Sequence, residues 1–227
     1  MIDVYYFSGS GHSLEVAAFC AERLGARMIS VERGMKCGKG ERALLIFPVY
    51  CENIPKPVKY FLRESRAKYL ALIATFGGIS YGRVLYEAQK IFAGRVIAGA
   101  YVPTEHAYRR DGFRFDGDAL EPFFKKLLCG QEISIPKTPK NIFSDFLPAW
   151  RSRRGVKLIR SSACDGCGRC VTQCPTGAMR AGRAGHRCIR CLRCLRVCPK
   201  AAISFRVRPV LKAYLKSRRL KETVLYL

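Results

Sequence analysis

Two copies of one cysteine pattern decide the fold of this chain: residues 164–175 read CDGCGRCVTQCP, and residues 188–199 read CIRCLRCLRVCP. Both copies have the spacing C-x2-C-x2-C-x3-C-P. Soft thiolate ligands bind iron–sulfur clusters, and zinc is the competing metal. Zinc sites usually combine two short motifs into one set of four ligands. Four cysteines in each motif, both closed by proline, therefore favour iron–sulfur clusters over zinc or disulfides.

The paired pattern resembles the cysteine run of bacterial two-cluster ferredoxins, in which the fourth cysteine of each run ligates the other cluster. The resemblance implies two [4Fe–4S] clusters with crossed ligation. Cluster 1 would be held by Cys164, Cys167, Cys170 and Cys198, and cluster 2 by Cys188, Cys191, Cys194 and Cys174. We expect a small strand after each motif, near 178–180 and 202–205. A unit of about 40 residues has too small a core to fold alone, so its clusters also stabilise it.

The first 130 residues alternate between strand and helix patterns. Residues 2–7, 42–47, 69–76 and 96–102 are rich in aliphatic and aromatic residues, which is typical of strands buried in a parallel sheet. A further strand is expected at 26–31 and a loop at 35–40. Helical spacing recurs at 14–24, at 57–63, in a segment ending at 91, and at 118–128. This order predicts an α/β fold with a doubly wound parallel sheet of five strands.

The loop between the first strand and the first helix reads SGSGHS over residues 8–13. A helix N-terminus offers free N–H groups and the positive end of the helix dipole, and serine hydroxyls add hydrogen-bond donors. The loop has neither the lysine of an ATP-type phosphate loop nor the third glycine of a dinucleotide fingerprint. We therefore expect it to bind a phosphate through these residues: Ser8, Gly9, Ser10, Gly11, His12 and Ser13.

This loop resembles the flavodoxin phosphate loop, [ST]-x-[ST]-G-x-[ST], which binds the phosphate of FMN. His12 stands where flavodoxins often have Asn, and a neutral histidine still donates one hydrogen bond. The resemblance covers about residues 1–135 and implies that FMN lies at the carboxyl ends of the strands. Beside its ring would lie a second loop, Val49, Tyr50, Cys51, Glu52 and Asn53, and a third, Thr75, Phe76, Gly77, Gly78, Tyr81 and Gly82.

Three aromatic residues of these loops are candidates to stack on the FMN ring: Tyr50, Phe76 and Tyr81. The tryptophan that many flavodoxins place in the second loop is missing, since the only Trp is Trp150. His106 follows the fifth strand at the same end of the sheet. Because histidine titrates near neutral pH, His106 is a candidate proton donor, and a surface or hydrogen-bonding residue is the alternative.

The formal charge of the chain is +24, and 18 of these charges lie in residues 151–227. Such a surface attracts acidic proteins, nucleic acids or anionic membranes. Because many electron carriers are acidic, an acidic redox protein is the preferred partner, nucleic acid is disfavoured, and a small substrate remains open. Residues 207–227 are expected to form a basic amphipathic helix that packs on its own protein or lies on a membrane surface. The proline-containing linker is expected to pack through its aromatic residues: Phe143, Phe146 and Trp150.

These patterns divide the chain into a flavodoxin-like domain (1–135), a linker (136–160), a ferredoxin domain (161–206) and the C-terminal helix (207–227). No apolar run reaches the ~18 residues of a membrane span, and no secretory signal is evident. We expect a protein of the reducing cytoplasm. The whole chain resembles flavodoxin–ferredoxin fusion proteins, which implies electron transfer between two [4Fe–4S] clusters and FMN. An FMN-dependent reductase of a small substrate is the alternative, followed by a redox sensor or nucleic-acid binder.

Overall fold

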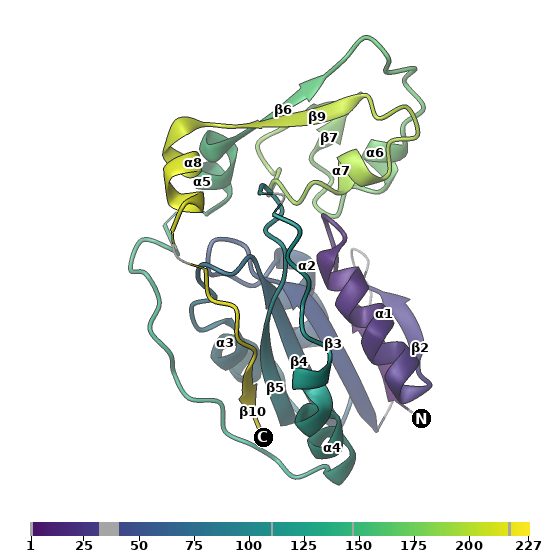
Figure 1. The fold of residues 1–227 in the computed structure, drawn as a ribbon. Helices are drawn as coiled ribbons and strands as arrows, with labels where there is room; N and C mark the ends of the chain where they lie inside the picture. Colours follow the sequence, from purple (N-terminus) through teal and green to yellow (C-terminus); the bar gives the residue numbers. More distant parts are fainter. Residues whose placement is uncertain (1, 32–40, 110, 147, 218) are drawn as a thin grey trace.

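The computed structural model describes residues 2–31, 41–109, 111–146, 148–217 and 219–227. Figure 1 shows a larger α/β unit with a smaller unit above one end of its sheet. The loop expected at 35–40 lies outside the described residues. No helix in the described ranges is long and apolar enough to cross a membrane.

A six-stranded sheet forms the centre of the larger unit. Its strands lie in the order β10-β5-β4-β3-β1-β2, and the neighbours among the first five strands of the chain pair in parallel. These five are β1 (Ile2–Tyr6), β2 (Arg27–Ser30), β3 (Arg42–Pro48), β4 (Tyr69–Phe76) and β5 (Arg95–Pro103). The order 2-1-3-4-5 is that of flavodoxin-like folds. The predicted fold class is therefore confirmed, with one additional strand, β10.

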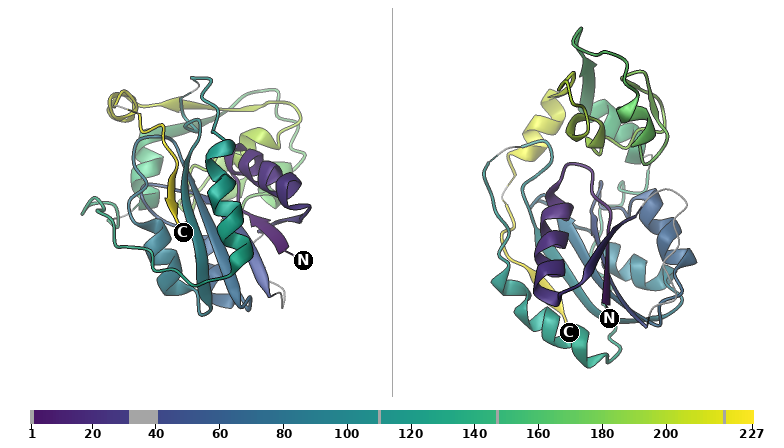
Figure 2. Two further views of the ribbon diagram at one scale, coloured as in Figure 1. Left: turned by 60° about the horizontal axis from the view of Figure 1, so that its bottom comes forward. Right: turned by 90° about the vertical axis from the view of Figure 1, so that its right-hand side faces the viewer.

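Helices cover both faces of this sheet (Figure 2). The helices α2 (Lys56–Glu64) and α3 (Val84–Ile91) bury residues such as Phe61 and Leu85 against one face. The helices α1 (His12–Leu24) and α4 (Glu121–Cys129) bury Val16 and Phe123 against the other, and a short 3₁₀ turn, η1 (Asp118–Leu120), leads into α4. Buried strands therefore hold the loops at their carboxyl ends on a rigid support.

The smaller unit begins earlier than the sequence suggests. Its longest pair of strands is β6 (Val156–Arg160) with β9 (Ile203–Val207), which run antiparallel. The last five residues of the expected linker are thus a strand of this unit. The other elements are short: α6 (Arg169–Thr172), β7 (Met179–Arg180), β8 (Arg183–Ala184) and α7 (Arg193–Arg196). Strands follow both cysteine motifs, near the positions expected.

The C-terminal segment corrects the prediction of one helix over 207–227. Helix α8 (Pro209–Leu215) is short, and the chain then returns to the larger unit as β10 (Val224–Tyr226), antiparallel to β5. Leu225 packs on one core of the sheet and Tyr226 on the other, which is the alternation of a strand. The apolar end of the chain thereby covers the open edge of β5, and both ends of the smaller unit are tied to the larger one (Figure 1).

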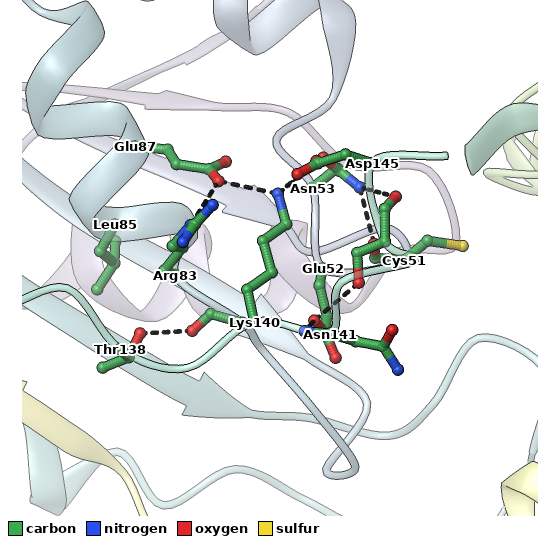
Figure 3. A network of polar contacts seen from close by, with 12 residues as sticks. Cys51, Glu52, Asn53, Arg83, Leu85, Glu87, Thr138, Lys140, Asn141 and Asp145 are labelled. Carbon is green, nitrogen blue, oxygen red and sulfur yellow. Dashed lines mark hydrogen bonds and ion pairs between the residues drawn. The ribbon is translucent and has the colours of Figure 1, made fainter. Parts of the chain in front are cut away.

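The linker is held by polar contacts rather than by its aromatic residues. Phe143 and Phe146 are 64% and 66% exposed, and a short helix, α5 (Pro148–Gly155), follows them. The ammonium group of Lys140 contacts the Glu87 carboxylate at 2.8 Å and the Asp145 carboxylate at 2.7 Å, and its side chain is 2% exposed. Figure 3 shows this lysine between α3 and the linker. The predicted aromatic packing of Phe143 and Phe146 is therefore wrong.

We expect Lys140→Ala to loosen the linker and to lower the free energy of unfolding by about 2 kcal/mol, because it leaves a half-buried carboxylate at Glu87 with less compensation. The solvent exposure of Asp145 keeps the effect below that of a fully buried ion pair. Thermal unfolding and limited proteolysis of residues 136–150 measure the change. Lys137→Ala is the matched control, since Lys137 is exposed in the same segment. Equal effects of the two variants would refute the role given to Lys140.

Candidate functional site

The cysteines assigned to cluster 1 lie around one small pocket. Cys164, Cys167, Cys170 and Cys198 all line it, although Cys198 comes from the second motif. This is the crossed set that the sequence implied. Among the described residues, no three His, Cys, Asp or Glu side chains converge closely enough to hold a single metal ion.

The cysteines assigned to cluster 2 lie deeper. Cys188, Cys191 and Cys194 are buried, whereas Cys167 of cluster 1 is exposed. Burial, together with the neighbouring thiols of Cys191, Cys188 and Cys174, raises the pKa of the Cys194 thiol to about 12. Burial therefore disfavours the thiolate of Cys194 unless a bound metal stabilises it.

The two motifs share one backbone conformation at a spacing of 24 residues. Gly166 and Gly168 have φ angles of 76° and 74°, and Arg190 and Leu192 have φ angles of 56° and 64° at the matching positions. The last cysteine of each motif accepts a backbone N–H four residues later: Ala178 donates to Cys174 Sγ at 3.2 Å, and Ala202 donates to Cys198 Sγ at 3.3 Å. The smaller unit is thus a structural repeat. In its second half, non-glycine residues take the positions that glycine occupies in the first.

A cavity of about 780 Å³ opens at the carboxyl ends of the strands. All three predicted loops reach it. The predicted residues that line it are Ser10, His12, Ser13, Val49, Tyr50, Cys51, Glu52, Thr75, Phe76, Gly77 and His106. Seven predicted residues do not line it: Ser8, Gly9, Gly11, Asn53, Gly78, Tyr81 and Gly82. Toward α5 and α8, its mouth is lined by Trp150, Arg151, Arg154, Arg208 and Tyr214.

The first loop leaves hydrogen-bonding groups available to an anion. Helix α1 begins at His12, and no described side chain caps its N-terminal N–H groups. The Ser8 side chain is 1% exposed, and within the described ranges its hydroxyl has no hydrogen-bond partner. The Ser13 hydroxyl bonds to the Thr75 hydroxyl at 2.8 Å, which joins the first loop to the third. An unpartnered buried hydroxyl beside a helix N-terminus fits an anionic ligand.

The second loop is a tight turn. Tyr50 and Asn53 exchange two backbone hydrogen bonds of 3.1 and 3.0 Å, and Cys51 and Glu52 between them have φ angles of 50° and 58°. Burial opposes ionisation of Glu52, but hydrogen bonds from Ser80, Asn141 and Ser144 together hold the pKa of its carboxyl below the ordinary value. The carboxylate therefore fastens the linker to this turn, and Cys51 is left at the cavity wall.

The residues of the third loop that do not line the cavity contact other parts of the chain instead. The ring of Tyr81 stacks on Tyr101 with centroids 4.0 Å apart. The carbonyl of Gly78 accepts the N–H of Leu220, and that of Gly82 accepts the hydroxyl of Thr138. Tyr81 is thus half-buried and packs against the core, and Tyr50 and Phe76 are the candidate stacking aromatics that reach the cavity.

His106 lies at the cavity wall as a neutral ring. Burial, followed by the nearby charges of Arg109 and Arg219, lowers its pKa to about 4. The N–H of Tyr108 donates to His106 Nδ1 at 3.1 Å, so Nε2 carries the proton. The ring packs closely against Gly77: a Cβ added to Gly77 would lie 2.2 Å from Cδ2 of His106. At neutral pH, His106 can donate a hydrogen bond, and it is not an imidazolium.

The two units meet where the first loop touches the second cysteine motif. A Cβ added to Gly9 would lie 2.2 Å from the carbonyl oxygen of Cys191 and 2.7 Å from the hydroxyl of Tyr50. The Tyr108 hydroxyl donates to the carbonyl of Arg190 at 2.7 Å. Cys191, a predicted cluster 2 ligand, therefore lies directly against the first loop and near Tyr50 of the second.

Two arginines that the sequence analysis missed complete this junction. Arg193 donates Nε and Nη2 to the carbonyl of Ser8 at 3.1 and 3.0 Å, and Arg196 donates Nε to the carbonyl of Gly9 at 3.1 Å. A signal was present, because the second motif carries three arginines and the first motif only one. Their target was not visible, since the loop lies 185 residues earlier in the chain.

Comparisons with known proteins agree with the cysteine motifs. Residues 158–180 and 186–202 each match a sequence family described as a 4Fe-4S binding domain. The chain therefore carries two 4Fe-4S binding domains. It has no match among curated proteins.

Two solved structures resemble the chain weakly. A proposed flavoprotein from Bacteroides uniformis is 13% identical with a TM-score of 0.42, and the match covers 55% of this chain and 97% of that one. A proposed flavoprotein from Bacteroides eggerthii is 14% identical with a TM-score of 0.39, covering 56% of this chain and 98% of that one.

Proposed function

We propose that this chain is an electron-transfer protein that passes electrons between two [4Fe–4S] clusters and an FMN bound in the 780 Å³ cavity. One observation carries the proposal. Cys191 of the second cysteine motif lies against Gly9 and Tyr50, which belong to the loops expected to bind FMN. A cluster held there and a flavin in the cavity would be neighbours.

The residues of the cavity fit FMN. The start of α1, which no described side chain caps, suits its phosphate. Ser10, His12 and Ser13 would hold the phosphate, the turn at 50–53 and residues 75–77 would flank the ring, and Nε2 of His106 could donate a hydrogen bond to it. When bound, a flavin exchanges one or two electrons, whereas each cluster exchanges one at a time.

Burial of the cysteines supports an order for the three cofactors. Cluster 2 would lie beside the cavity, because three of its four cysteines are buried and Cys191 lies against the first of the loops expected to bind FMN. Cluster 1 would lie toward solvent, because Cys167 is exposed and the pocket of cluster 1 is also lined by Arg169 and Lys200. Electrons would then pass between a partner and FMN through cluster 1 and cluster 2, in that order or the reverse.

The charge of the smaller unit supports an acidic redox protein as that partner. Residues 151–227 hold 20 basic and 2 acidic residues. A surface with such a field steers an oppositely charged partner toward it. Docking around Arg169 and Lys200 would bring the partner's redox centre close to cluster 1.

The mouth of the cavity favours a second candidate, an FMN-dependent reductase that the clusters supply with electrons. The mouth is lined by aromatic residues such as Trp150 and Tyr214 and by three arginines. These residues could hold a small anionic substrate over the flavin. The same three cofactors would serve both functions, so only the electron acceptor separates the two candidates.

Anaerobic reconstitution with iron, sulfide and FMN tests the proposal. We expect about eight irons and one FMN per chain. Reduction by an acidic ferredoxin-type carrier should slow as salt is raised, because ions screen the attraction. Full iron content without bound FMN would overturn the flavin assignment and leave the cluster assignment standing. A rate that does not change with salt would overturn the acidic partner.

A further inference from the structure

We propose that Arg193 and Arg196 hold the loop at 8–13 in the conformation that binds the FMN phosphate, so that assembly of cluster 2 and binding of FMN strengthen each other. The proposal rests on the proposed binding of FMN in the cavity. It assigns a role to two residues outside the flavodoxin-like domain, and it predicts which cluster is coupled to the flavin.

Both arginines act on the backbone of the first loop. They bind the carbonyls of Ser8 and Gly9, which are therefore turned toward the smaller unit. Carbonyl oxygens that face a phosphate would repel it, whereas N–H groups attract it. By holding these carbonyls away from the cavity, the arginines favour a loop conformation suited to an anion.

The arginines also bring positive charge to a loop whose residues 8–13 include neither lysine nor arginine. The Arg193 side chain is 3% exposed, and its guanidinium lies over the Phe7 ring, 5.2 Å from the centroid. The Arg196 side chain runs along the loop, with Cδ 3.8 Å from where a Cβ of Gly11 would lie. Both cations therefore stand beside the start of α1, where the proposed phosphate binds.

Cluster 2 holds these arginines in place. Arg193 and Arg196 flank Cys194 on α7, a helix of only four residues. So short a helix is not stable without the tertiary contacts around it. Loss of cluster 2 should therefore release both arginines from the loop. Because coupling between two binding sites is reciprocal, FMN should in turn slow the loss of cluster 2.

The first cysteine motif provides a matched control. Arg169 takes the place of Arg193 in the first motif, 24 residues earlier, and it is exposed beside the pocket of cluster 1. Arg169→Ala removes the same side chain from the same position of the repeat, away from the FMN loop.

Titration with FMN and with riboflavin, followed by flavin fluorescence, tests the proposal. For Arg196→Ala and Arg193→Ala we expect the dissociation constant of FMN to rise about tenfold, with little change for riboflavin, which has no phosphate. Arg169→Ala should bind FMN like the parent protein. Removal of the clusters by a chelator should weaken FMN binding in the parent, and FMN should slow the release of iron to the chelator.

The outcomes separate this proposal from the function on which it rests. A parent protein that does not bind FMN contradicts the proposed function. A parent protein that binds FMN with an affinity unchanged by Arg196→Ala, by Arg193→Ala and by cluster removal overturns the coupling alone. Equal weakening of FMN and riboflavin binding by both variants also overturns it, because the arginines would then act on the fold and not on the phosphate.

Discussion

Replacement of Gly9 by valine is expected to separate the two units. The added Cβ would lie 2.2 Å from the carbonyl oxygen of Cys191 and 2.7 Å from its Cβ, and a backbone atom cannot rotate away. Overpacking of this kind costs typically 1–3 kcal/mol, and more where the backbone must shift. If the smaller unit moves away, the hydrogen bonds from Arg193 and Arg196 to the loop are lost as well.

Three measurements follow the separation of the units. We expect faster proteolysis of residues 156–208, slower electron transfer between clusters and flavin, and a lower midpoint of thermal unfolding. Gly112→Ala is the control, because an added Cβ meets no described atom within 4 Å and the change introduces only backbone strain. Undiminished electron transfer and unchanged proteolysis in Gly9→Val would show that the loop and the second motif are not in contact in solution.

Local patterns predicted most of the larger unit. The strand Tyr69–Phe76 has the predicted bounds, and α1 ends at Leu24, the last residue of the predicted helical spacing, before Gly25 with a φ of 56°. Spacing of apolar residues and glycines determines such elements, and both are visible in the sequence. The resemblance to two-cluster ferredoxins likewise implied that Cys198 belongs with the first motif, and Cys198 lines the same pocket as the cysteines of that motif.

Contacts between segments that are distant in the chain could not be predicted from the sequence. The strand β10 forms because the edge of β5 can accept another strand. The residues around 224 do not indicate that they pair with β5, which lies more than 100 residues earlier in the chain. Tyr81 was expected at the flavin, but its ring packs on Tyr101, 20 residues later in the chain. The arginines of the second motif contribute to the total charge of the chain, and only the folded chain shows that two of them bind the loop at 8–9. Side-chain partners across units depend on how the units dock.

The proposed crossed ligation predicts opposite results from two similar substitutions. Cys174 lies in the first motif, and its neighbours include Cys191 and Cys194. Cys198 lies in the second motif and lines the pocket of cluster 1. We therefore expect Cys174→Ser to deplete cluster 2 and Cys198→Ser to deplete cluster 1, each leaving about four irons per chain. Iron analysis and low-temperature electron paramagnetic resonance of the reduced proteins measure both losses.

The dissociation constants of the two variants for FMN distinguish the loss of cluster 2 from the loss of cluster 1. Cys174→Ser should weaken FMN binding about tenfold, because α7 and its arginines depend on cluster 2. Cys198→Ser should bind FMN nearly as the parent protein does, since the pocket proposed for cluster 1 is lined by no residue of the loop at 8–13. If each motif instead held its own cluster, the two variants would exchange these results. Full iron content in both variants would contradict the assigned ligand sets. Because serine keeps a hydroxyl at the same position, a loss of iron reports the missing thiolate and not the loss of a side chain.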